Sequence, residues 1–147
     1  MRALHKLLLS LTLASANIPL AAHSSEQLAT LGMRNLAAYS PQEQESHLHL
    51  LISEHPGDMA LHFHLGNLLA GQQRWAAART AYARAAELSI EHPDIHYNLA
   101  IALDHLGQST QAARHYRMAL RAAKNRPHMF HPTTAEQRLR EIGASAS

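Results

Sequence analysis

The sequence predicts an all-α fold in which antiparallel helix pairs stack side by side as an α-solenoid. Three observations lead to this prediction. The pattern of small and apolar residues repeats at an interval of 34 residues. Only 5% of the 147 residues are aromatic while alanine is abundant, which favours closely packed helices over a sheet. Apolar residues also recur at helical spacing, so each helix has one face to bury.

Residues 1–22 have the three-part layout of a secretory signal peptide. A basic start that carries Arg2 precedes the short, mostly apolar run 7–14, and small residues follow. We expect cleavage after Ala22 or after Ala16, because small residues precede both positions.

A membrane anchor is the alternative for the same segment. The apolar stretch 7–22 holds only sixteen residues, and polar residues and Pro19 interrupt it. Crossing a bilayer takes about 20 predominantly apolar residues. We therefore predict an exported protein, periplasmic or secreted, that has no membrane span once the signal peptide is removed.

The charge of the mature chain does not indicate a nucleic-acid partner. Removing residues 1–22 takes away two of the thirteen Lys and Arg, which leaves eleven bases against eleven acids. The basic isoelectric point, about 9.3, therefore owes much to the signal peptide. One local bias remains, because residues 105–135 contain five bases and no acid. The absence of Cys excludes disulfides, thiolate metal ligands and a Cys nucleophile.

Two units of the chain, residues 59–92 and 93–126, carry the repeat most clearly. Each is expected to form one helix pair. The aligned positions are Leu65-Gly66 with Leu99-Ala100 in the first halves, and Ala78, Tyr82 and Ala85 with Ala112, Tyr116 and Ala119 in the second halves. Small residues at these positions allow helix backbones to approach closely, and a single pair is too small to bury its own apolar stripe.

A third unit, residues 25–58, is a degenerate helix pair. It keeps Leu31-Gly32 in register with the other units and closes on Pro56. However, Gln44 stands where the other units have a small residue.

This pattern resembles the tetratricopeptide repeat (TPR) family, whose units read W-x2-L-G-x2-Y, then A-x3-F, then a small residue, and close on Pro. In this sequence His62 and His96 take the Trp position. The resemblance is close over residues 59–126 and weak over residues 25–58. It implies a right-handed superhelix whose concave face is lined by the first helix of each pair.

Turn and cap signals fall between the predicted helices. Asp58 and Pro93 are expected at helix starts, and Gly107 in a turn. The repeat stops at residue 126, and a loop is predicted over residues 127–132.

A capping helix is predicted over residues 133–143. Thr133 with Glu136 three residues later has the pattern of a capping box, and Gly143 is expected to end the helix. Leu139 and Ile142 can cover the open end of the stack, as a repeat array requires.

Thirteen histidines raise the question of a metal site. His62 and His64 are two residues apart, and side chains at this spacing point to nearly opposite sides of a helix. The H-E-x-x-H pattern of a helical zinc site is absent. His128 and His131 lie in the predicted loop without a carboxylate close in sequence. We therefore predict packing and surface histidines, no metal ligand and no cofactor. A histidine-based metal or haem handling protein of the cell envelope is the alternative function.

Catalytic patterns are missing as well. The sequence contains no G-x-S-x-G, phosphate-binding loop, G-x-G-x-x-G or EF-hand pattern. We therefore do not expect an enzyme.

The resemblance to the TPR family also implies a binding site. On the concave face of this chain it places the peptide-binding residues Phe63, Asn67, Tyr97, Asn98, Ile101, Asp104 and His105. Asn67 and Asn98 stand where the family often uses Asn to hydrogen-bond the backbone of an extended peptide, and ordinary polar surface residues are the alternative. The implied function is an interaction adaptor or assembly factor that binds a peptide or a partner protein in its groove.

Overall fold

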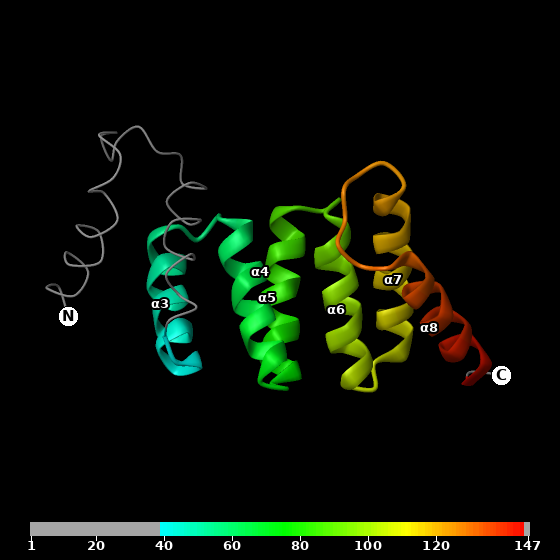
Figure 1. The fold of residues 1–147 in the computed structure, drawn as a ribbon, viewed down its shortest axis with the longest axis horizontal. Helices are drawn as coiled ribbons and strands as arrows, with labels where there is room; N and C mark the ends of the chain where they lie inside the picture. Colours follow the sequence, from blue (N-terminus) through cyan, green and yellow to red (C-terminus); the bar gives the residue numbers. More distant parts are fainter. Residues whose placement is uncertain (1–38, 146–147) are drawn as a thin grey trace, which may run out of the picture.

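A computed structural model describes residues 39–145, and this part of the chain consists of helices and turns without a strand. Figure 1 shows the helices standing side by side in one row, with α3 at one end and α8 at the other. Their bounds are α3 Pro41–Glu54, α4 Met59–Gly71, α5 Trp75–Leu88, α6 Pro93–His105, α7 Ser109–Ala123 and α8 Pro132–Ser145. The predicted all-α solenoid is therefore confirmed.

The row is built from helix pairs. α4 packs against α5 and α6 against α7, and α5 joins the two pairs by packing against α6. α3 packs on α4 and α8 packs on α7, so each lies beside one of the two central pairs. The predicted signal peptide, residues 1–22, and residues 25–38 of the first unit lie outside the described residues.

Capping hydrogen bonds and a proline explain where α3, α4 and α6 begin. Ser40 caps α3 in a capping box, in which the Glu43 carboxylate accepts from the Ser40 backbone N–H at 2.9 Å and the Glu43 N–H donates to the Ser40 hydroxyl at 3.4 Å. Asp58 caps α4, with its carboxylate accepting from the Ala60 N–H at 2.9 Å. Pro93 is the first residue of α6, where its missing N–H costs nothing.

The start and end of α8 differ from the prediction. The helix begins at Pro132, so Thr133 lies inside the first turn and does not cap the helix. Proline suits this position because its fixed φ is helical and the first turn needs no N–H. The helix also continues through Gly143 to Ser145. Leu139 and Ile142 do pack against the core as expected, next to the fully buried Ala135.

One glycine controls how closely α4 and α5 pack. A Cβ atom added to Gly66 would lie 2.4 Å from two ring carbons of Tyr82, well inside any tolerable contact. The Tyr82 ring therefore occupies the space that a side chain at position 66 would need. Both residues are buried, and Tyr82 is only 2% exposed.

The two buried histidines perform the same structural task in successive repeats. His62 Nε2 donates to the backbone carbonyl of Pro56 at 3.0 Å, and His96 Nε2 donates to the carbonyl of Ile90 at 2.6 Å. In each case the histidine ties the first helix of a pair to the turn that precedes it. These histidines thus have the packing role that the repeat register predicted.

His96 also makes a contact with α7. Because its Nε2 donates to Ile90, its Nδ1 is free to accept, and His115 Nδ1 donates to it at 3.3 Å. Burial, together with the nearby His96 and Arg114, lowers the pKa of His115 to about 4.

Replacing Gly66 by Ala tests the packing of α4 on α5. Overpacking of this kind costs about 1–3 kcal/mol of unfolding free energy. Gly71→Ala is the matched control, because nothing lies within 4 Å of a Cβ added there. We expect urea denaturation to show destabilisation for Gly66→Ala and no loss for Gly71→Ala, and equal stability of the two variants would contradict this packing.

The half-buried His115 predicts a loss of stability in acid. Its pKa is lowered on folding, so it stabilises the fold above the unfolded-state pKa near 6.5, and that stability is lost as the pH falls toward about 4. For this half-buried ring we expect a contribution on the order of 1 kcal/mol after solvent screening. Urea denaturation of the wild type and of His115→Gln across this pH range should show a weaker pH dependence for the variant. An identical pH dependence would exclude the assignment.

Candidate functional site

The predicted concave residues Asn67 and Asn98 lie together, although they come from different repeats. The side-chain nitrogen of Asn98 on α6 donates to the side-chain oxygen of Asn67 on α4 at 3.1 Å. The Tyr82 hydroxyl donates to the same Asn67 oxygen at 2.8 Å. Burial raises the pKa of Tyr82 to about 12, so its hydroxyl keeps the proton that it donates.

This arrangement leaves one donor and one acceptor available. Among the described residues, the Asn67 side-chain NH2 group and the Asn98 side-chain oxygen have no other hydrogen-bond partner. An extended peptide backbone presents an N–H and a C=O in the same way, so the pair can bind it through both groups. Asn67 is exposed and Asn98 is half-buried, so both are accessible.

Phe63 supplies an apolar surface beside the two asparagines. Its ring lies 5.9 Å from that of Tyr82 and 6.0 Å from that of His92, measured between ring centroids. Phe63 is half-buried and packs against the core cluster. It can therefore contact an apolar side chain of a ligand without leaving its place in the fold.

Tyr97 is already in contact with another part of the chain. Its ring stacks on Phe130 with centroids 4.4 Å apart and planes inclined by 9°. Phe130 belongs to residues 126–131, which we call the C-terminal strap. The strap runs from the end of α7 across α6 to the start of α8 (Figure 1). The predicted loop thus supplies a residue that covers the predicted site.

Asp104 likewise binds the C-terminal part of the chain. Arg138 of α8 donates to both carboxylate oxygens, from Nε to Oδ2 at 2.5 Å and from Nη2 to Oδ1 at 2.9 Å. The Asp104 side chain is only 12% exposed, so this ion pair is partly shielded from water. Its position on α6 therefore serves to anchor the capping helix.

The remaining predicted residues are Ile101 and His105, both on α6. Ile101 is half-buried and packs against the core. His105 stacks on Trp75 at the start of α5, with ring centroids 3.8 Å apart and planes inclined by only 4°. The structure therefore joins Asn67 to Asn98 directly, whereas the His105 ring stacks on α5.

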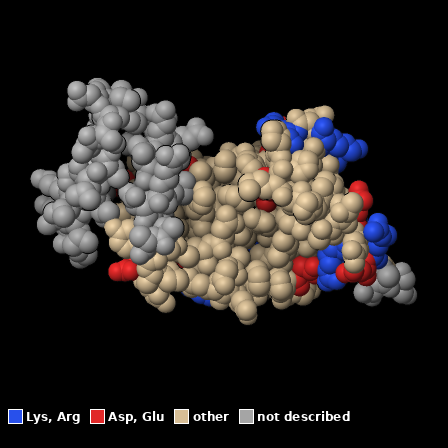
Figure 2. All heavy atoms as spheres, in the orientation of Figure 1, with Lys and Arg blue, Asp and Glu red and all other residues tan. Residues whose placement is uncertain are grey.

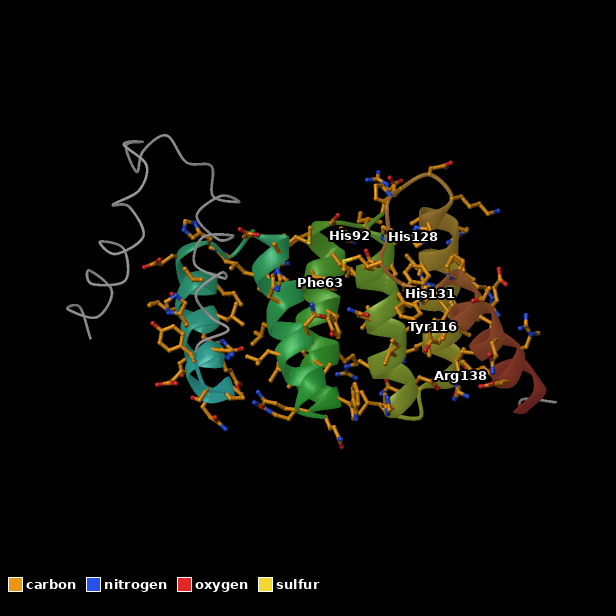
Figure 3. All side chains as sticks on the ribbon, in the orientation of Figure 1. Phe63, His92, Tyr116, His128, His131 and Arg138 are labelled. Carbon is orange, nitrogen blue, oxygen red and sulfur yellow. The ribbon has the colours of Figure 1, made fainter. Side chains whose placement is uncertain are left out.

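Figure 3 shows how the aromatic and histidine side chains flank α6. Phe63 and His92 lie toward α4, while His128 and His131 lie toward α7. Figure 2 shows Lys and Arg atoms gathered toward the C-terminal end and a largely uncharged surface over the middle helices. This face can therefore accept an uncharged, partly apolar segment.

Sequence reasoning missed two residues of this site, Asp94 and Phe130. Asp94 follows Pro93 in the first turn of α6, and one of its carboxylate oxygens accepts from the backbone N–H groups of Met129, at 2.8 Å, and Phe130, at 3.3 Å. The only signal for Phe130 was an aromatic residue in a loop between two prolines.

The histidines do not form a metal centre in the described part of the chain. No group of three or more His, Asp or Glu side chains there is placed to hold a metal ion. Among the same residues, no helix is both long and apolar enough to cross a membrane.

Comparison with known proteins agrees with this architecture. The tetratricopeptide repeat pattern matches residues 45–93 and, in a second overlapping match, residues 63–127. None of the proteins with curated descriptions matches this sequence.

Several solved structures share the fold at low sequence identity. The Yersinia enterocolitica type III secretion translocator chaperone SycD superposes with a TM-score of 0.73 and 18% identity, over 86% of this chain and 90% of that one. PcrH in complex with the chaperone-binding region of PopD gives a TM-score of 0.72 and 21% identity, over 86% and 98%. The first TPR of Spaghetti (RPAP3), bound to an HSP90 peptide, gives 0.68 and 18%, over 84% and 94%.

The family match spans more than half of the sequence, and together the two matched ranges include the helix pairs α4–α5 and α6–α7. The chain belongs to the tetratricopeptide repeat family.

Proposed function

We propose that this protein is an exported adaptor or assembly factor that holds an extended segment of a partner protein on the face formed by α4 and α6. The observation that carries the proposal is the Asn67–Asn98 pair, which leaves one amide donor and one amide acceptor available. Phe63 and the uncharged surroundings favour a segment that carries apolar side chains.

Proteins of the same fold support this proposal. SycD has been solved with a peptide of the translocator YopD, PcrH with the chaperone-binding region of PopD, and the RPAP3 repeat with an HSP90 peptide. At 18–21% identity the likeness to these structures shows the fold alone, so we infer the partner of this chain from the chemistry of its own residues. That chemistry favours an extended, uncharged and partly apolar peptide.

The proposal also assigns a non-catalytic role and an exported location. Neither the sequence patterns nor the described site suggests a nucleophile with an activating base, and the ion pairs of Arg74 with Glu45, Arg84 with Glu87 and Arg126 with Glu91 lie at the surface. Export rests on the signal-peptide layout of residues 1–22.

Replacing Asn98 by Ala tests the binding face. The change removes the amide acceptor and the contact with Asn67, and one lost hydrogen bond of about 1 kcal/mol weakens binding about fivefold. Asn125→Ala is the matched control, because Asn125 is exposed beyond the end of α7. We expect mass spectrometry to show less of the main partner captured from cell-envelope extract by Asn98→Ala than by the control. Equal capture by both variants would rule out this face as the binding site.

The N-terminus of the protein purified from its source cells tests export. Cleavage of the signal peptide should leave a chain that starts at Asn17 or at His23. Mass spectrometry of the intact protein and of its N-terminal peptide distinguishes the two starts. Recovery of the intact N-terminus from the cytoplasmic fraction alone would show that the protein is not exported.

A further inference from the structure

We propose that the C-terminal strap is an intramolecular ligand that occupies the α6 part of the concave face, and that a peptide with an aromatic side chain binds there by replacing it. The inference deepens the proposed function and rests on it for the idea that a partner competes for this surface. The strap shows which chemistry α6 recognises, because it is already bound there in cis.

The strap is held through its backbone as a bound peptide would be. One carboxylate oxygen of Asp94 accepts from the consecutive N–H groups of Met129, at 2.8 Å, and Phe130, at 3.3 Å. These contacts do not depend on the side chains of the strap, so Asp94 can bind another peptide that bends to present two consecutive N–H groups, as Met129 and Phe130 do. Asp94 lies in the first turn of α6, where the N-terminal end of the helix dipole favours its negative charge.

An aromatic side chain completes the contact. Phe130 stacks on Tyr97 at 4.4 Å, and Tyr97 in turn contacts the ring of Tyr116 at 5.8 Å. His128 adds a ring 5.0 Å from Phe130. Tyr97 is therefore the base of an aromatic subsite, and Phe130 is its present occupant.

The length of the strap region exceeds what the connection requires. The links between the other described helices are three or four residues long, whereas residues 124–131, eight in number, connect α7 to α8. The connection from α5 to α6 is of the same kind, because it also leads from the second helix of a pair to the helix that follows. It needs only four residues. The additional residues carry the chain over α6, where Met129 and Phe130 make their contacts.

The strap can leave without the loss of the capping helix. α8 has its own anchors, namely the ion pair of Arg138 with Asp104 and the buried Ala135. In contrast, the Met129 side chain is 93% exposed, and the pair of Arg126 with Glu91 is exposed to solvent on both sides. Such exposed contacts contribute little, so the strap is held mainly by Asp94 and by the Phe130 ring.

Because the strap competes for the same site within the chain, it sets the affinity that a partner peptide needs. A short tether gives the strap an effective concentration in the millimolar range at its own site. A partner peptide must therefore bind α6 better than the strap does, or first bind the open surface at Phe63 and Asn67 and then displace the strap.

The test uses the full chain and a synthetic peptide with the strap sequence, residues 126–131, acetylated and amidated at its ends. Binding is followed through the backbone amide NMR signals of Asp94 and Tyr97, with peptide added to millimolar concentration. Phe130→Ala opens the aromatic subsite, and Met129→Ala is the matched strap control because its side chain is exposed. Phe130→Leu keeps apolar bulk and replaces the Ala variant if that one fails to fold.

We expect saturable shifts in the Phe130 variant at peptide concentrations at least tenfold lower than in the wild type or in Met129→Ala. A peptide with Ala in place of its Phe, or the addition of Tyr97→Ala to the protein, should abolish them. Equal binding by the wild type and the Phe130 variant, or no binding by the variant at millimolar peptide, would overturn the proposal.

The result is separable from the test of the proposed function, because the probe is the chain's own sequence. A partner captured equally by Asn98→Ala and its control would remove the proposed function and leave the strap result standing. Loss of strap binding would remove this inference and leave partner capture through Asn67 and Asn98 intact.

Discussion

The close approach of Tyr82 to Gly66 is the constraint on which the rest of this structure depends. Because position 66 has no Cβ, the Tyr82 ring lies against α4, and its hydroxyl reaches the Asn67 side chain at 2.8 Å. Asn67 then accepts from Asn98 of the next repeat. The absence of a side chain at position 66 thus allows the hydrogen bonds that hold two amide groups in place on the face that we propose binds the partner. The same hydrogen bonds join neighbouring repeats across that face.

The next repeat uses the same scaffold for a different purpose. Ala100 stands in the place of Gly66, and the buried Tyr116 stands in the place of Tyr82. Burial, followed by the negative charge of Asp104, raises the pKa of Tyr116. Asp104 in turn binds Arg138. In the pair α6–α7, Asp104 thus binds the capping helix and Asp94 binds the strap, whereas the pair α4–α5 makes no such contacts through Asn67. The concave face is therefore asymmetric along the solenoid.

Local and periodic features could be predicted from the sequence, and contacts set by tertiary folding could not. The interval of 34 residues placed Gly66, Tyr82 and the two buried histidines correctly, because helical packing repeats whenever its residues repeat. Contacts of the strap involve residues outside the repeat, and the bond from Met129 to Asp94 spans 35 residues without any periodic signal. Pro132 starts α8 one residue before the predicted Thr133, because helix-start patterns compete within a few residues.

A double-mutant cycle between Tyr82→Phe and Asn98→Ala tests the central claim most directly, with the free energy of unfolding as the measured quantity. Both residues donate to the Asn67 side-chain oxygen from different repeats, at 2.8 Å and 3.1 Å. If that oxygen joins the repeats into one preformed face, the two changes are non-additive by about 0.5 kcal/mol or more. Additivity within about 0.3 kcal/mol would show that the two hydrogen bonds are independent and that Gly66 and Tyr82 do not organise the face.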